Sequence, residues 1–191
     1  MNGRPSMVTD LKSDYREQLR SELITRYGKV VYTFTAHEKD AHRLRAKDRR
    51  LRWSQLIFSA ITAGGFLVTV FPTWAKTIGA IFAVALVIVN AATKNFNPAA
   101  KAEEHQKAAD RLWIVREEYE ALLTDFNELS DDEIREKRDN LTKTVANIYV
   151  TTPRTSEKAY QEAQHALKKE EEQTFNEGEA ERFLPPVLRR Q

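Results

Sequence analysis

WSQLIFSAITAGGFLVTVF, residues Trp53–Phe71, runs for 19 positions without a charged side chain. A second uncharged run, TIGAIFAVALVIVNAAT, occupies the 17 positions Thr77–Thr93. At about 1.5 Å per residue, helices over these runs are roughly 28 Å and 26 Å long, close to the ~30 Å hydrocarbon core of a bilayer. Lipid offers the backbone no hydrogen-bond partner, so a spanning segment of this kind is helical. The pattern predicts an all-α membrane protein built on a hairpin of two transmembrane helices.

The connection between the runs suits the end of a hairpin. Pro72 disfavours continuation of a helix, and Trp74 and Lys76 are residue types that gather at the lipid headgroups. The alternative is a buried core hairpin of a soluble protein. A water-facing helix keeps a wide polar stripe, whereas the only polar residues in these runs are Ser, Thr, Gln and Asn. The membrane interpretation is therefore favoured.

The flanking charges predict the orientation of the hairpin. Cytoplasmic flanks of membrane spans are enriched in Lys and Arg. The cations beside the two runs are Arg43, Arg45, Lys47, Arg49, Arg50 and Arg52 before the first, and Lys94 and Lys101 after the second. The hairpin tip offers only Lys76. We expect a multi-pass membrane protein with both termini in the cytoplasm.

The overall composition excludes several other classes of protein. The net charge is +2, so charge alone does not indicate a nucleic-acid partner. The chain has no cysteine, which excludes disulfides and thiolate metal or redox sites. The first long apolar run begins only around Leu51, so we expect no cleavable signal peptide.

Small and polar residues recur on one side of each apolar run, at spacings of three, four or seven. The members of the two faces are Gln55, Ser59, Thr62 and Thr69 in the first run and Gly79, Ala83 and Asn90 in the second. Such residues allow close helix packing in lipid. They are equally suited to line a polar pore formed by several copies of the chain. None is ionisable, so a charged selectivity ring within the spans is not supported.

The segment before the hairpin has helical periodicity. Its apolar residues lie three or four apart, and they are Val8, Leu11, Tyr15, Leu19, Leu23, Tyr27, Val30 and Phe34. This spacing is typical of an amphipathic helix. Gly28 is a candidate break, but nothing from Val30 onward stops a helix. We expect one long helix that enters the membrane with its basic section at the lipid surface.

Three further helices are predicted after the hairpin, beyond a short connection at residues 95–98. The first, over about 99–129, carries a heptad seam suited to packing on a partner helix. The seam comprises Leu112, Val115, Tyr119, Leu122, Phe126 and Leu129. Ser130 and Glu133 have the spacing of a capping box that opens the second, which ends near Tyr149. The third, after Pro153, covers about 156–173.

These elements divide the chain into four parts of one predicted domain, residues 1–191. The parts are an N-terminal helical region (8–52), the hairpin (53–93), cytoplasmic helices (94–175) and a C-terminal tail (176–191). The apolar, Pro-rich residues 183–188 of the tail are suited to dock on the bundle or on a neighbouring chain.

No set of residues with the pattern of a catalytic or metal site is visible. His37 and His42 are five apart, whereas a metal-binding pair on one helical face is three or four apart. We therefore expect them to be surface groups, and we expect His105 and His165 to stand alone. The phosphate loop of nucleotide-binding enzymes and the nucleophile elbow of hydrolases are missing. We expect no enzyme activity, no metal and no cofactor.

The cations beside the membrane have two interpretations. The run Arg43–Arg52 places six of them at the lipid surface, where they attract anionic headgroups. They could equally contact an anionic ligand or partner. Arg154, between Pro153 and a helix start, is a second candidate for anion contact, and its alternative role is an ordinary ion pair.

Several segments, in order, resemble SLATT-domain proteins over roughly residues 19–188. They are RYGKVVYT with HEK (26–33 and 37–39), SAITAGGF (59–66), LWIVREEY (112–119), PRTSEKAY (153–160), EQTF (172–175) and FLP (183–185). The resemblance implies a prokaryotic two-helix membrane module encoded beside nucleotide-generating enzymes in antiphage, CBASS-like systems. A nucleotide second messenger triggers such effectors to permeabilise the inner membrane. The resemblance identifies no catalytic or nucleotide-binding residues in this chain.

Two functions follow as hypotheses. The first is an oligomeric, ligand-gated pore-forming effector, because two helices alone cannot enclose a water path. Its partners are membrane lipids, other copies of the chain, and a nucleotide second messenger or its synthase, but no nucleic acid. The second is a membrane-anchored adaptor or scaffold that recruits a cytoplasmic partner and forms no pore.

Overall fold

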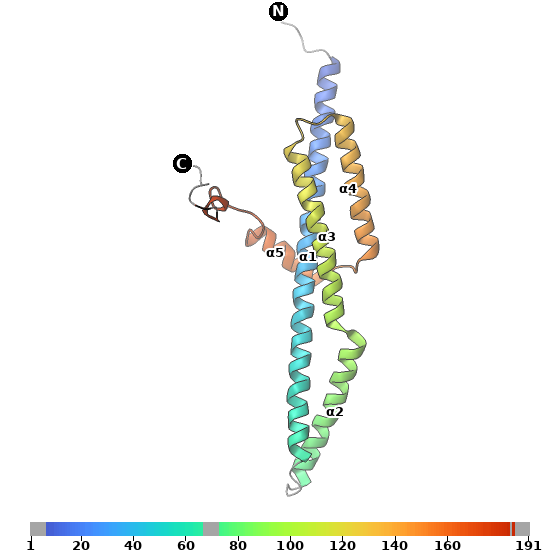
Figure 1. Cartoon of the computed structure of the whole chain (residues 1–191), viewed down its shortest axis with the longest axis vertical. Coiled ribbons are helices and arrows are strands. Elements are labelled where there is room, and N and C mark those ends of the chain that lie inside the picture. Colours follow the sequence, from blue (N-terminus) through green and yellow to red (C-terminus); the bar gives the residue numbers. More distant parts are fainter. Residues whose placement is uncertain (1–6, 67–72, 184, 186–191) are drawn as a thin grey trace, which may run out of the picture.

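The computed structural model describes residues 7–66, 73–183 and 185, and these residues form helices and no strand (Figure 1). The elements are α1 (Met7–Phe66), α2 (Thr73–Phe96), α3 (Pro98–Thr124), α4 (Asp131–Thr151), α5 (Glu157–Lys169) and a short 3-10 helix, η1 (Ala180–Phe183). The molecule is elongated, with the N-terminus at one end and the α1–α2 hairpin at the other. The predicted all-α fold, with a two-helix hairpin and a helical bundle, is confirmed.

Helix α1 is continuous for 60 residues and serves both the bundle and the hairpin. The expected long helix into the first apolar run is therefore confirmed. Gly28 does not break it, because a helical glycine costs only about 1 kcal/mol relative to alanine and the surrounding turns remain hydrogen-bonded. The consequence is a single uninterrupted rod that joins the N-terminal part of the bundle to the hairpin.

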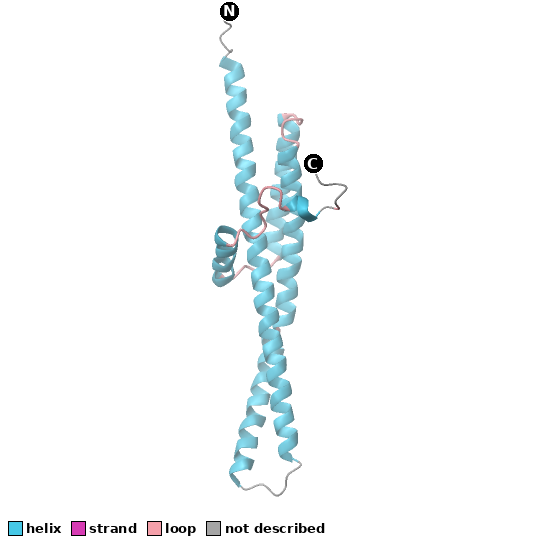
Figure 2. Ribbon diagram, turned by 90° about the vertical axis from the view of Figure 1, so that its left-hand side faces the viewer, coloured by secondary structure: helices cyan, strands magenta, loops and turns pink. Residues whose placement is uncertain are grey.

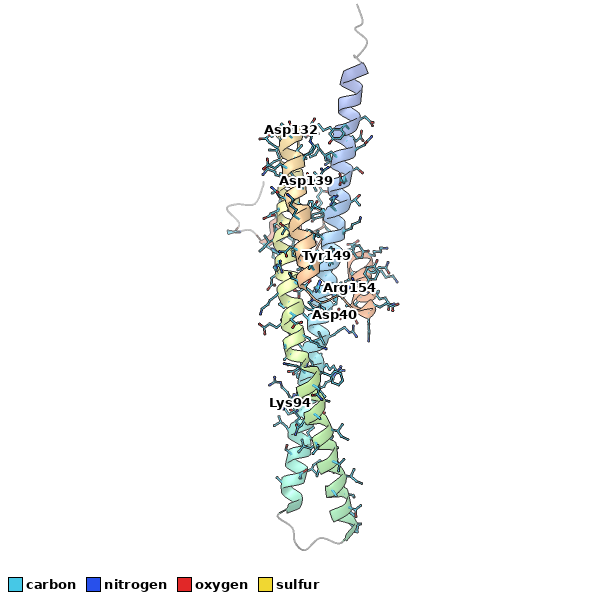
Figure 3. The ribbon with its side chains drawn as sticks, turned by 90° about the vertical axis from the view of Figure 1, so that its right-hand side faces the viewer. Asp40, Lys94, Asp132, Asp139, Tyr149 and Arg154 are labelled. Atoms are coloured by element: carbon cyan, nitrogen blue, oxygen red, sulfur yellow. The ribbon has the colours of Figure 1, made fainter. Side chains whose placement is uncertain are left out.

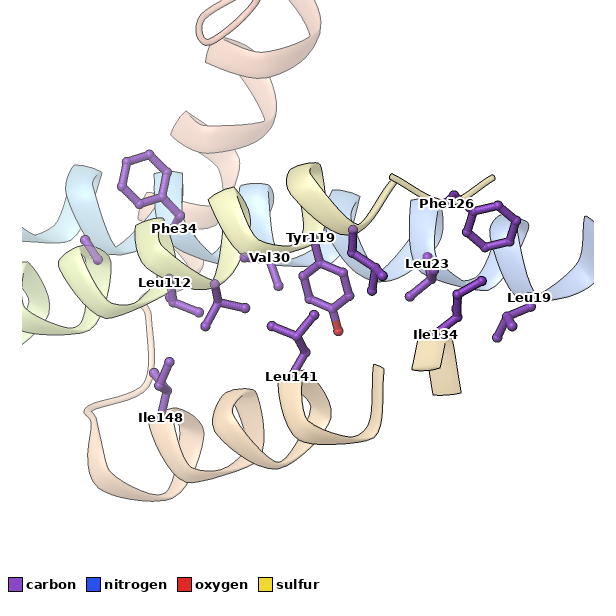
Figure 4. Close-up of a cluster of buried hydrophobic side chains, with 13 residues drawn as sticks. Leu19, Leu23, Val30, Phe34, Leu112, Tyr119, Phe126, Ile134, Leu141 and Ile148 are labelled. Carbon is purple, nitrogen blue, oxygen red and sulfur yellow. The ribbon is translucent and has the colours of Figure 1, made fainter. Parts of the chain in front are cut away.

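The bundle core lies where α1 and α3 run side by side and α4 covers them (Figure 4). Leu19, Leu23 and Val30 of α1 meet the α3 seam, and Ile134 and Leu141 of α4 close the cluster. All six predicted seam residues belong to this cluster. The partner of the seam is thus the same chain, so the seam does not supply the surface for assembly that the sequence suggested.

A single residue, Asn97, separates α2 from α3. It adopts a left-handed conformation (φ 34°, ψ 67°), and its side chain accepts a hydrogen bond from the Ala100 amide at 3.2 Å. Asparagine tolerates this conformation better than most residues do. Pro98 follows at the first helical position, where its missing amide costs nothing. The predicted short connection is therefore a sharp joint between two helices.

Local capping sets the boundaries of α4 and α5. The Ser130 hydroxyl accepts a bond from the Glu133 amide while the Glu133 carboxylate accepts one from the Ser130 amide, so the predicted capping box is present. Ser156 caps α5 in the same way through the amide of Ala159. Helix α5 ends at Lys169, four residues earlier than expected, and it packs three alanines against α1: Ala159, Ala163 and Ala166.

The hairpin projects beyond the bundle, and no other described element covers it (Figure 2). Within the described residues, the stretch Thr77–Thr124 contains one helical window long and apolar enough to cross a membrane. That window has a mean hydropathy of 1.8, and none of it is buried. The core helix of a soluble protein would be mostly buried, so the uncovered window favours the membrane interpretation. The end of the first run, with Thr69 and Pro72, lies outside the described residues.

Candidate functional site

The hairpin is held together by polar and aromatic contacts between α1 and α2. The Gln55 amide donates to the Thr93 hydroxyl at 3.0 Å, and that hydroxyl donates to the Val89 carbonyl at 2.9 Å. Further along, the rings of Phe58 and Phe82 lie 5.7 Å apart, a normal distance for an aromatic pair. The sequence placed Gln55 level with Asn90, but its hydrogen-bond partner is Thr93, one helical turn nearer the bundle.

The polar faces predicted from the sequence divide into two groups. Thr62 is half-buried and its hydroxyl donates to the Phe58 carbonyl at 2.8 Å; Gly79 and Ala83 are half-buried on α2. Gln55, Thr62 and Ala83 fit the helix-packing role, whereas a Cβ at Gly79 would meet no atom within 4 Å, so Gly79 makes no close helix contact among the described residues. Ser59 and Asn90 are instead exposed, and their side chains form no hydrogen bond with the described residues. Thr69 lies outside the described residues.

The basic run also divides, because part of it is committed to protein contacts. Arg45 donates to Gln106 at 2.9 Å, the Lys47 ammonium lies 5.7 Å from the centre of the Phe96 ring, and Arg52 pairs with Asp48 at 2.7 Å. Arg49 and Arg50 are exposed, and so are Lys94 and Lys101. Within the described part of the chain these four cations have no acidic partner. Figure 3 shows Lys94 where the bundle meets the hairpin.

The first cation of the run, Arg43, belongs to a structural cluster that fixes α5. The buried Asp40 carboxylate accepts hydrogen bonds from both the amide and the hydroxyl of Ser156, each at 2.7 Å. Arg43 donates to the same hydroxyl at 3.0 Å and lies 3.7 Å from Glu162. Arg43 is therefore committed to contacts within the protein, which attach the start of α5 to α1.

Arg154 lies in the connection between α4 and α5 and is exposed (Figure 3). It has no ion-pair partner among the residues that the structure describes. The anion-contact role expected from the sequence is therefore not replaced by a tertiary ion pair, and it remains a prediction.

Two histidines that the sequence separated form a buried pair. His37 is only 2% exposed, so the expectation of a surface group is wrong, and its Nδ1 lies 3.0 Å from Nδ1 of His105. The expectation that His105 stands alone is wrong as well. The two residues are 68 positions apart and meet only because α1 and α3 run side by side. No local spacing rule could have found them.

Burial governs the protonation of this pair. Desolvation lowers the pKa of His37 from 6.5 to about 4, with His105 adding to the effect and Asp40 opposing it. Desolvation also lowers the pKa of His105, against the pull of Asp40 and Glu104. Both rings are therefore neutral at pH 7, which allows one Nδ1–H to donate to the other ring. Among the described residues, no group of three or more His, Asp or Glu side chains could hold a metal ion.

Comparison with known protein families gives a match over most of the chain. The model of the SMODS and SLOG-associating 2TM effector domain family 4 matches residues 17–179, which include most of α1, the hairpin, α3, α4 and α5. The chain belongs to this family. The resemblance to SLATT proteins is thereby confirmed. No curated protein and no solved structure gives a significant match.

Membership of the SLATT family identifies the class of protein. The family is a two-transmembrane effector domain associated with antiphage systems, and it is not a known enzyme family. The two helices of its description correspond to the α1–α2 hairpin, whose apolar side chains face outward. The hairpin and its junction to the bundle are therefore the candidate functional site of this SLATT chain.

Proposed function

We propose that the chain is an oligomeric, pore-forming membrane effector of a prokaryotic antiphage system. A nucleotide second messenger triggers it, and it then permeabilises the inner membrane and causes abortive infection. The proposal rests on the outward surface of the hairpin, where two polar side chains, Ser59 and Asn90, lie among apolar residues and have no hydrogen-bond partner among the described residues. Catalysis plays no part in this function.

The orientation follows from the cations at the base of the bundle. Arg49 and Arg50 on α1 and Lys94 and Lys101 around the α2–α3 joint stand at the same end of the hairpin and have no acidic partners in the described chain. Their number favours the cytoplasmic side of the inner membrane. Both termini and the bundle are then cytoplasmic, residues 1–191 act as one domain, and anionic lipid headgroups contact these four cations.

Assembly is supported by the cost of leaving an amide unpaired in lipid. The Asn90 side chain is exposed on the hairpin and hydrogen-bonds to no described residue, although hydrocarbon offers it no partner. Contact with another copy of the chain would satisfy both Asn90 and Ser59. Because two helices cannot enclose water, a ring of such contacts is also what a pore requires.

The proposal is tested by following membrane potential in cells. The chain is produced in bacteria with the nucleotide synthase encoded beside it, and a potential-sensitive dye reports permeabilisation. We expect depolarisation that depends on the synthase, and its loss in Ser59→Leu/Asn90→Leu. Ile88→Leu, an exposed apolar position on α2, is the control that should depolarise like the original chain. An unchanged potential with the protein in the membrane and the nucleotide confirmed refutes the proposal.

A membrane-anchored scaffold is the second candidate, and one surface outside the hairpin favours it. Phe175 and Phe183 are 65% and 76% exposed, and their rings lie 6.3 Å apart. An exposed aromatic pair is suited to contact a partner protein. If Ser59→Leu/Asn90→Leu keeps full toxicity but Phe175→Ser/Phe183→Ser abolishes it, the scaffold replaces the pore.

A further inference from the structure

A polar groove of about 500 Å³ opens between α1 and α4, with α3 as its floor. Its walls include Arg26 and Lys29 of α1, Thr142 and Tyr149 of α4, and Tyr119 of α3. Small-molecule sites in proteins usually measure about 300–1000 Å³ and combine apolar walls with a few convergent polar groups. The groove has the size and the lining of such a site, and it lies in the bundle, away from the hairpin.

Positive charge exceeds negative charge at this groove. Glu22 is a carboxylate in its wall and is shared between Arg26, at 2.7 Å, and Arg138, at 3.3 Å. The exposed ammonium of Lys29 has no acidic partner among the described residues. Arg138 lies beside the groove and also pairs with Asp139 at 2.8 Å, so the three cations face two carboxylates and leave a net charge of +1. The arrangement attracts an anion, which Lys29 is free to contact.

Hydroxyl groups and an aromatic ring add recognition elements. The Arg26 guanidinium donates to the Thr142 hydroxyl at 3.0 Å, and the buried Tyr119 hydroxyl faces the same two groups. In Figure 4 that hydroxyl points from α3 toward α4. Tyr149 is half-exposed at the rim, and its hydroxyl lies 3.0 Å from that of Thr33. A phenol ring in this position offers a face on which a planar base can stack.

The two walls of the groove are joined by long polar side chains. Beyond the bridges at Arg26 and Arg138, Arg16 reaches from α1 to Asp131 at the start of α4. Such partly exposed bridges are individually weak, on the scale of surface ion pairs. A charged ligand can therefore replace some of them without disrupting the apolar cluster of α1 and α3.

We propose that this groove binds a nucleotide, with its phosphates on Lys29 and Arg26 and its base against Tyr149. This inference rests on the proposed function, because it locates the trigger that the effector requires. The site also suits transmission of a signal. Lys29 and Trp53 belong to the same uninterrupted helix, 24 residues or about 36 Å apart, so a displacement of α1 at the groove reaches the membrane along one rod.

The experiment measures binding to the full chain in detergent micelles. Cyclic di-AMP, cyclic di-GMP, ATP and inorganic pyrophosphate are each titrated by calorimetry. We expect saturable binding of at least one nucleotide, weakened tenfold or more by Lys29→Glu and restored by Lys29→Arg. Tyr149→Leu should weaken the nucleotide but not pyrophosphate. Lys168→Glu, the same charge change on the exposed surface of α5, is the control and should leave binding unaltered.

Each contrary result overturns the proposal in a defined way. Binding of none of the nucleotides removes the site, and equal loss of affinity in Lys29→Glu and Lys168→Glu reduces it to general charge attraction. Equal affinity for pyrophosphate removes the base contact. The membrane-potential assay separates this failure from that of the proposed function: a Lys29→Glu chain that still depolarises cells in response to the synthase leaves the pore in place but excludes the groove as the site of its trigger.

Discussion

Helix α1 packs in two opposite senses along its length. In the bundle its apolar side chains, such as Leu23, face the α3 seam and are buried, while charged groups face outward. In the hairpin its apolar side chains, such as Leu56, face outward, and the polar Gln55 turns inward to Thr93. The exposed face of this one helix thus changes from charged in the bundle to apolar in the hairpin. The same residue type has opposite energetic value in the two regions, because the medium outside differs.

Truncating one leucine in the bundle and one in the hairpin should give the largest difference between the two regions. Leu112 is fully buried at the bundle core, whereas Leu56 is 62% exposed on the hairpin. Leu112→Ala should lower the free energy of unfolding by about 2–5 kcal/mol, as buried leucine truncations do. Leu56→Ala leaves no cavity in the chain and should cost less than about 1 kcal/mol. Thermal unfolding of both variants in detergent, followed by circular dichroism, measures the difference; equal losses would break the comparison.

Acid should weaken the bundle at the buried histidines. Because the pKa of His37 is about 4 in the folded chain and 6.5 in the unfolded one, the unfolded state binds the extra proton between these values. The contribution of neutral His37 to the free energy of unfolding is therefore complete above pH 6.5, and it decreases as the pH falls toward 4. We expect a loss of roughly 1–3 kcal/mol, discounted for partial solvent access.

The measurement is the unfolding temperature at a series of pH values from 7.5 to 4.5. His37→Gln serves as the comparison chain, because the carboxylates of both proteins titrate alike and only the histidine contribution differs. A variant with the same pH slope as the original protein would show that the pair does not govern the response.

The basic run allows a third test, because Arg43 contacts α5 whereas Arg49 is exposed to solvent. Arg43→Gln removes contacts to Ser156 and Glu162, so α5 should detach more readily, by about 1–2 kcal/mol. Arg49→Gln should leave α5 attached, because Arg49 is exposed and has no acidic partner in the described chain. Hydrogen exchange of the α5 amides distinguishes the two variants. Faster exchange in both would mean that the run acts as one charged surface.

The smallest expected effect concerns the hydrogen bond inside the hairpin. Gln55→Leu removes the donor to Thr93, and interhelical bonds of this kind in membranes are worth about 0.6 kcal/mol on average. Ser54→Leu, one residue earlier and bonded only to the Arg50 carbonyl, is the control. Reversible unfolding in mixed micelles measures both. A loss above about 2 kcal/mol for Gln55→Leu would show that the polar contact, rather than lipid immersion, holds the hairpin together.

Local signals in the sequence predicted most of the fold. The capping box at Ser130, the apolar period of α4 and the long α1 all follow from spacing within one helix, and all are present in the structure. The heptad seam was identified correctly, but its partner was not. A seam specifies that something apolar covers it, without specifying whether the covering helix belongs to the same chain.

The features that the sequence did not reveal all depend on contacts between distant segments. His37 meets His105, Asp40 meets Ser156, and Arg26 meets Thr142 across 68, 116 and 116 positions. Two of these separations are equal, but neither 68 nor 116 positions is a spacing within one helix, so only the packing of α1 on other helices brings the pairs together. The candidate faces of the hairpin were predicted from period alone, which could not tell that Ser59 and Asn90 point away from the partner helix.

Because Asn97 separates α2 from α3, the two helices of the hairpin differ in how they are joined to the bundle. The descending leg, α1, could bend only by breaking consecutive helical hydrogen bonds. The ascending leg is interrupted at one residue of positive φ followed by an imino acid without an amide proton, so it can pivot there with few bonds lost. A movement of the bundle would therefore reach the hairpin mainly through the continuous helix α1, while α2 can change its angle to α3 at Asn97.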